Sequence, residues 1–284
     1  MISKRTVIRF TVLCSLVCSK VSAQVLATED AKPLKPGQIH LETTMGFERA
    51  SDSKEYTWAA MVKYRLTRRL FMFSVEPTFI SSIHPDSGVS ATGIGDVDAT
   101  LYLKMVEEKK VLPFMSLAFE TKIPTAKNRL IGTGKVDFTP TFVANKTTGN
   151  FFTSINFGYT IIGKPDSVIA NNFFSYGVAS IFTPKKRSLL FAEIYGNTTA
   201  VDPEKNQGRI FPNSTIRENS EFSGGETVFA IGYGYDFQNG WLLSLKVSYN
   251  NTKSILMEAG IEWESATKKI TKVVKRVKKE AQKE

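Results

Sequence analysis

The feature that most constrains this chain is an alternation of apolar with polar or small side chains, which recurs in segments of about ten residues between positions 39 and 263. In residues 241–249, Trp241 and Leu243 share one side of an extended chain, and Ser244 and Lys246 share the other. A period of two is typical of β-strands whose two faces meet different surroundings, and helical spacing is almost absent here. The sequence therefore predicts an all-β fold.

Twelve segments share this alternation. When an even number of antiparallel strands closes on itself, the first strand pairs with the last, and the two chain ends lie at the same end of the strands. The predicted strands are residues 39–47, 56–66, 71–79, 97–105, 115–123, 138–144, 151–161, 174–182, 189–195, 227–235, 241–249 and 255–263.

Alternation alone does not separate a soluble sandwich from a membrane barrel, but three further features do. Aromatic residues stand near both ends of apolar faces, as at Tyr56 and Tyr64 or Trp241 and Tyr249. Such rings are expected at the two lipid interfaces. The polar faces carry full charges in mid-strand, which a dry core would not accept. The connections alternate between short turns and longer loops, of which 198–225 is the longest.

These features predict a transmembrane antiparallel β-barrel of about twelve strands in the bacterial outer membrane. A closed barrel leaves no strand edge exposed to lipid. Short turns belong on the periplasmic side of such barrels, so both termini are expected there. The expected partners are outer-membrane lipids, a small-molecule solute, and the barrel-assembly machinery during insertion.

The inward face is predicted to be polar, with more acids than bases, around a narrow or loop-plugged path, because twelve strands lie between filled small barrels and open porins. The candidate lumen-lining residues are Glu42, Lys63, Glu76, Asp98, Lys104, Glu120, Lys122, Asp137, Glu193, Lys246 and Glu258.

The two ends of the chain differ from the body. Residues 1–23 have a basic start, an apolar stretch and a small-residue end, which is typical of a cleaved secretory signal. Residues 24–38 are predicted to be a periplasmic linker, 39–263 the barrel and 264–284 a basic tail, either an amphipathic helix or a solvated extension. The formal charge of +10 comes from the signal and the tail, so nucleic-acid binding is not expected. Both cysteines, Cys14 and Cys18, lie in the signal, so the mature chain has no disulfide or thiolate metal site.

Two stretches contain specific motifs in addition to the alternation. Residues 92–98 spell Thr-Gly-Ile-Gly-Asp-Val-Asp, and residues 123–125, Ile-Pro-Thr, are followed at 132–140 by Gly-Thr-Gly-Lys-Val-Asp-Phe-Thr-Pro. This combination resembles the outer-membrane transporter family named for the meta-pathway of phenol degradation. The resemblance implies a lone outer-membrane barrel that admits hydrophobic or aromatic small molecules, and it supplies no catalytic residues.

Four acids could gather into a cation site, but pairing with lysines is favoured because buried charges of one sign are costly without partners. The sequence therefore predicts no metal site and no cofactor. The acids are Asp96, Asp98, Glu120 and Asp137, and the lysines are Lys104, Lys122 and Lys135.

Three functions remain to be compared. The first is a channel for passive passage of small solutes, hydrophobic or aromatic ones included, and the second is a structural or adhesive surface barrel acting through its external loops. The third, an outer-membrane hydrolase with His40 as base, is disfavoured because no serine stands in a nucleophile-elbow context. We therefore predict a channel and not an enzyme.

Overall fold

The computed structural model describes residue 34 and residues 37–265, with gaps at 51–52, 66–70, 87–88, 129–130, 165–169, 186, 199–224, 238–239 and 252. The predicted signal at 1–23, the tail from 266 onward and most of the longest predicted loop lie outside the described residues. Within these described segments, no helix has the length and apolar character needed to cross a membrane.

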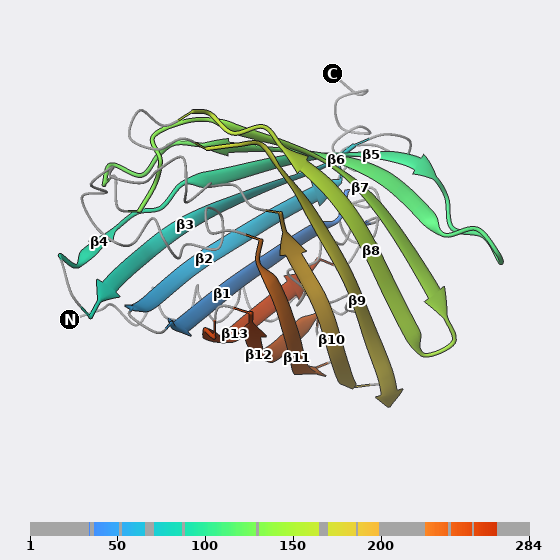
Figure 1. The fold of residues 1–284 in the computed structure, drawn as a ribbon. Helices are drawn as coiled ribbons and strands as arrows, with labels where there is room; N and C mark the ends of the chain where they lie inside the picture. Colours follow the sequence, from blue (N-terminus) through green and yellow to red (C-terminus); the bar gives the residue numbers. More distant parts are fainter. Residues whose placement is uncertain are drawn as a thin grey trace, which may run out of the picture.

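The strands form one antiparallel sheet that closes on itself (Figure 1). Closure occurs because β1 pairs with both β2 and β13, while β2 also pairs with β3. The predicted transmembrane barrel of twelve strands is confirmed, with β4 and β5 together forming the fourth strand. The bounds are β1 Ile39–Arg49, β2 Ser53–Arg65, β3 Phe71–Pro85, β4 Ala91–Gly93, β5 Val97–Val106, β6 Phe114–Ile123, β7 Asp137–Thr148, β8 Phe151–Thr160, β9 Phe173–Lys185, β10 Ser188–Asn197, β11 Thr227–Asp236, β12 Trp241–Asn250 and β13 Ile255–Glu264.

The largest difference from the predicted strand boundaries lies in β3. This strand continues to Pro85, and β4 pairs with it in the stretch between the predicted strands 71–79 and 97–105. The cause is a register shift opposite Trp58, which leaves both Phe79 and Ile80 exposed, at 45% and 42%. A bulge inserts an extra residue, so side-chain parity reverses along the strand. The alternation in the sequence breaks at that point although the strand continues.

The outer face of the barrel is apolar, as β12 shows residue by residue. Trp241, Leu243 and Leu245 are exposed at 42%, 40% and 57%, whereas the intervening Leu242 and Ser244 are exposed at only 1% and 4%. Exposed apolar side chains on alternate strand positions are those that contact lipid in a membrane barrel.

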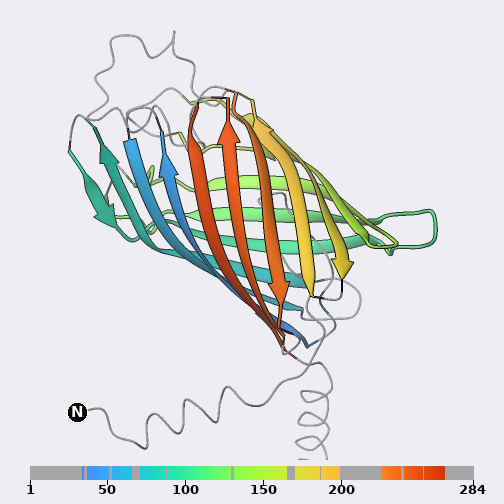
Figure 2. The same ribbon diagram turned by 90° about the horizontal axis from the view of Figure 1, so that it is seen from below.

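The two ends of the barrel can be told apart by their connections. At one end, which we call the terminal end, β1 begins and β13 finishes, and the backbone N–H of Ser265 donates to the carbonyl of Ile39 over 2.9 Å. The opposite end, the loop end, carries the connection between β10 and β11, which contains residues 199–224. Figure 2 shows that the β5–β6 hairpin projects beyond its neighbours at the terminal end.

The residues that carry the family resemblance meet where β4 gives way to β5. The Thr125 hydroxyl donates to the carbonyl of Gly95, and the N–H of Ala126 donates to Oδ1 of Asp96, both over 2.9 Å. A Cβ added at Gly132 would lie 2.8 Å from Oδ2 of Asp96, so only glycine fits beside this carboxylate. These hydrogen bonds therefore hold the loop after β6 against the short segment between β4 and β5. For Asp96, the described contact is with the backbone: its carboxylate accepts from the N–H of Ala126.

Candidate functional site

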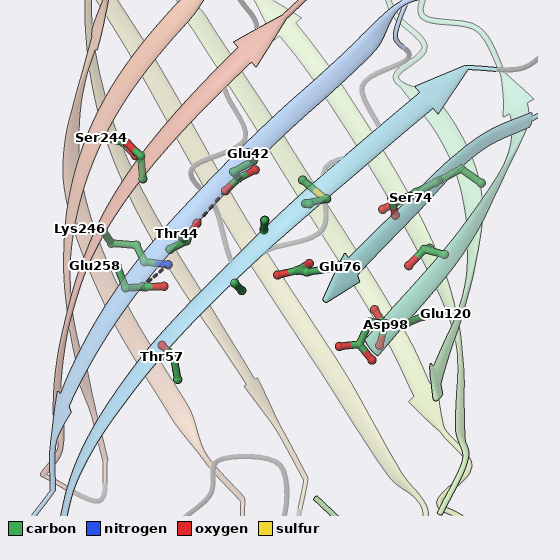
Figure 3. A pocket seen from close by; sticks show the side chains of 16 residues that line it. Glu42, Thr44, Thr57, Ser74, Glu76, Asp98, Glu120, Ser244, Lys246 and Glu258 are labelled. Atoms are coloured by element: carbon green, nitrogen blue, oxygen red, sulfur yellow. Dashed lines mark hydrogen bonds and ion pairs between the residues drawn. The ribbon is translucent and has the colours of Figure 1, made fainter. Parts of the chain in front are cut away.

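A cavity of about 430 Å³ lies inside the barrel, between the inward faces of β1, β2, β3, β5, β6, β12 and β13 (Figure 3). Along each strand, the residues that line the cavity alternate with residues whose apolar side chains point outward, because successive residues of a strand point to opposite faces. The serine and threonine residues of the wall are Thr44, Thr57, Ser74, Thr100 and Ser244.

Three carboxylates gather on one side of this cavity. Glu76 on β3 is the direct cross-strand partner of Asp98 on β5, and Glu120 lies on the next strand, β6. Figure 3 shows the three carboxylates close together and pointing into the cavity. None of the three side chains is buried.

The opposite side carries the only lysine among the residues that line the described cavity. Lys246 is buried, and its Nζ lies 2.6 Å from Oε2 of Glu258 and 3.4 Å from Oε1 of Glu193. Its positive charge is therefore neutralised by two immediate neighbours. With Glu42 and Glu258 added to the other three acids, the lining holds five carboxylates against one ammonium, and the cavity is electronegative.

Toward the terminal end, the inward face becomes apolar and tightly packed. One cluster contains Met72, Tyr102, Phe114 and Val143 from β3, β5, β6 and β7, and Leu34, which precedes β1, packs into it. The carbonyl of Leu34 accepts a hydrogen bond from the Arg65 guanidinium.

A second cluster lies on β8, β9 and β10 at the same end, where Phe152 packs against Ile181 and Phe191. The ring of Phe191 lies over Gly232, where an added Cβ would come within 2.0 Å of it. We call the two clusters together the apolar layer. It lies nearer the terminal end than the cavity does.

Comparison with known proteins gives this barrel a family. A family model described as “Putative MetA-pathway of phenol degradation” matches residues 27–263. The chain belongs to this family. No curated protein sequence matches it.

Solved structures agree on the fold. The barrel is similar to the COG4313 outer membrane channel from Pseudomonas putida F1, with a TM-score of 0.66 and 11% identity, over 84% of this chain and 99% of that chain. It is also similar to the NanC porin, with a TM-score of 0.51 and 10% identity, over 78% of this chain and 98% of that chain. The MetA-pathway chain thus has the fold of outer-membrane barrels.

The eleven candidate lumen residues of this MetA-pathway barrel fall into two groups. Six of them lie on the cavity, and the other five have partners elsewhere on the inward face or at a turn. The six are Glu42, Glu76, Asp98, Glu120, Lys246 and Glu258. Of the others, Glu193 pairs with Lys246, Lys122 pairs with Asp137, Lys63 lies 5.0 Å from the centre of the Tyr102 ring, and Lys104 bonds Glu107 over 3.2 Å at the β5–β6 turn.

Sequence reasoning missed two parts of the site. Leu34 belongs to the predicted linker, and its place in the apolar layer has no signal in the alternation. His40, considered above as a base for a serine, instead contacts Glu42 and Glu264. The serine contact belongs to the other histidine, since Ser82 Oγ lies 2.9 Å from Nε2 of His84 on β3. Pairing the first predicted strand with the last would have brought Glu264 beside His40.

Proposed function

We propose that this chain is an outer-membrane channel for the passive passage of small solutes, with cations favoured over anions. The observation that carries the proposal is the cavity inside a closed barrel, lined by five carboxylates and by one lysine that is paired with Glu193 and Glu258. A pore whose walls carry charge of one sign attracts ions of the opposite sign and resists those of its own. An anionic solute would meet repulsion at the carboxylates that line this cavity.

The apolar layer supports a finer part of this proposal, the passage of neutral aromatic solutes such as small phenols. An acidic field affects a neutral ring little, and the partly buried aromatic side chain of Phe152 offers a transient contact to it. The family description, which names phenol degradation, supports the same solute class.

The surface-structural alternative depends on the loop at 198–225, almost all of which lies outside the described residues. Ion conduction and solute uptake separate it from the channel.

The test is a measurement of reversal potential in planar bilayers with a potassium chloride gradient. We expect small conductance with cation preference in the natural protein. The triple variant Glu76→Gln, Asp98→Asn, Glu120→Gln should lose most of that preference, because it removes three of the five cavity carboxylates. Glu107→Gln is the matched control, since Glu107 is an exposed acid at the β5–β6 turn and should leave selectivity unchanged.

The same preparation in vesicles should admit phenol faster than protein-free vesicles after correction for bilayer leak. A barrel that conducts no ions and does not speed phenol uptake would contradict the channel proposal. A barrel that conducts but prefers anions would contradict the role given to the carboxylates.

A further inference from the structure

The seam where the barrel closes brings a histidine and two carboxylates together. His40 and Glu42 lie on β1, and Glu262 is the direct partner of Glu42 on β13. One ligand atom from each of the three residues lies within 4.8 Å of the other two. His40 and Glu262 are exposed at only 2% and 1%. The group is therefore enclosed within the wall and lumen at the terminal end.

The donor set is mixed. One imidazole nitrogen with two carboxylate oxygens is a combination that proteins use for zinc and for other first-row divalent metals. Glu42 approaches Nε2 of His40 to 3.5 Å, so this ring nitrogen is the one that faces the carboxylates. Small side-chain rotations would bring all three ligand atoms to one ion.

A separate observation concerns the other ring nitrogen. Nδ1 of His40 lies 3.8 Å from Oε1 of Glu264, and Oε2 of Glu264 accepts a hydrogen bond of 2.8 Å from the Gln38 amide. Metal-ligating histidines commonly turn their second nitrogen toward a carboxylate, which fixes the ring and its tautomer. In His40, a carboxylate lies near each ring nitrogen: Glu42 near Nε2 and Glu264 near Nδ1.

The local charge balance favours a divalent ion. The charged groups that act on His40 are Glu42, Glu262, Glu264 and Lys63. With a neutral imidazole, three carboxylates and one ammonium leave two negative charges. A protonated imidazole would offset only one of them, whereas a divalent cation offsets both.

We propose that His40, Glu42 and Glu262 bind a divalent transition-metal ion of the zinc type, with Glu264 as the positioning residue for the imidazole. The ion joins the first and last strands, so it fastens the barrel at its closing seam. This role does not depend on solute passage, although the two sites share Glu42, which also lines the cavity.

The test is titration of the tag-free mature barrel with Zn²⁺ and Co²⁺ in detergent after treatment with a chelator. Calorimetry should show one site, Co²⁺ should give a visible absorption band typical of nitrogen and oxygen ligands, and Zn²⁺ should raise the unfolding temperature. His40→Gln and Glu262→Gln should each weaken binding more than 100-fold. Glu264→Gln should weaken it by about 10- to 100-fold, the range for loss of an outer-shell partner.

His84→Gln is the matched control, because it removes the other histidine of the chain, and it should bind as the natural protein does. Heat-modifiable migration on gels checks that each variant is folded. Folded natural protein that binds neither ion, or folded His40→Gln that binds both as tightly as the natural protein, would overturn the proposal. The first result would mean that His40 serves only as an ion-pair partner of the carboxylates.

Discussion

The cavity and the apolar layer are built by the same strands, yet their inward faces are opposite in character. Along β3 the inward residues change from Met72 through Ser74 to Glu76 within five positions. Along β5 they change from Tyr102 to Asp98 over the same distance. The lumen therefore has two zones along its axis, a packed apolar zone at the terminal end and an open acidic zone above it.

We expect the packed apolar zone to contribute mainly to stability and the acidic zone mainly to ion selectivity. Packed side chains lose contacts and leave cavities when they are altered, so changes in the apolar layer should act on stability. The side chains of Glu76, Asp98 and Glu120 are not buried, so changing them should act mainly on the electrostatic field of the lumen. The following predictions examine this division.

The largest effect is expected at Lys246, which lies on the cavity but is buried between two carboxylates. Lys246→Ala should destabilise the barrel by about 3–5 kcal/mol, because it leaves Glu193 and Glu258 without their shared cation. Denaturant unfolding in detergent measures the change. Lys104→Ala, whose partner Glu107 is 77% exposed, is the control and should cost at most about 1 kcal/mol. Equal effects would show that burial does not distinguish the two lysines.

Gly232 tests packing in the apolar layer. Gly232→Ala should destabilise the barrel by about 1–3 kcal/mol, because the new methyl group would meet the Phe191 ring at 2.0 Å and the carbonyl oxygen of Leu245 at 2.5 Å. The same unfolding measurement applies. Gly234→Ala on the same strand face is the control, since its nearest contact would be 3.4 Å away. A Gly232 variant as stable as the Gly234 variant would mean that the layer has room to repack.

Leu34 tests whether the apolar layer limits flow. Leu34→Ala removes a side chain that packs on Met72 and Phe114 from outside the strands, so single-channel conductance should rise while cation preference stays the same. Leu112→Ala, at the exposed β5–β6 turn, is the control. Unchanged conductance would place the narrowest point elsewhere.

The sequence predicted what depends on local parity and missed what depends on closure. Lys246 and Glu258 could be assigned to the inward face because each stands in an unbroken alternation, and the structure places both on the cavity. The continuation of β3 could not be predicted, because the bulge at Phe79 reverses the parity. The approach of Glu262 to His40 was missed because it joins residues 222 positions apart through the pairing of the first strand with the last.

The outward placement of the tryptophans has a practical consequence for spectroscopy. The chain has three, Trp58, Trp241 and Trp263, and all three share the outward parity of their strands. Their fluorescence therefore samples lipid or detergent, and brominated acyl chains should quench it once the barrel has inserted. Entry of a solute into the lumen should therefore change the tryptophan fluorescence very little. A reporter for solute entry has to be introduced, and Thr57, an exposed residue on the cavity wall, is a suitable place for a fourth indole.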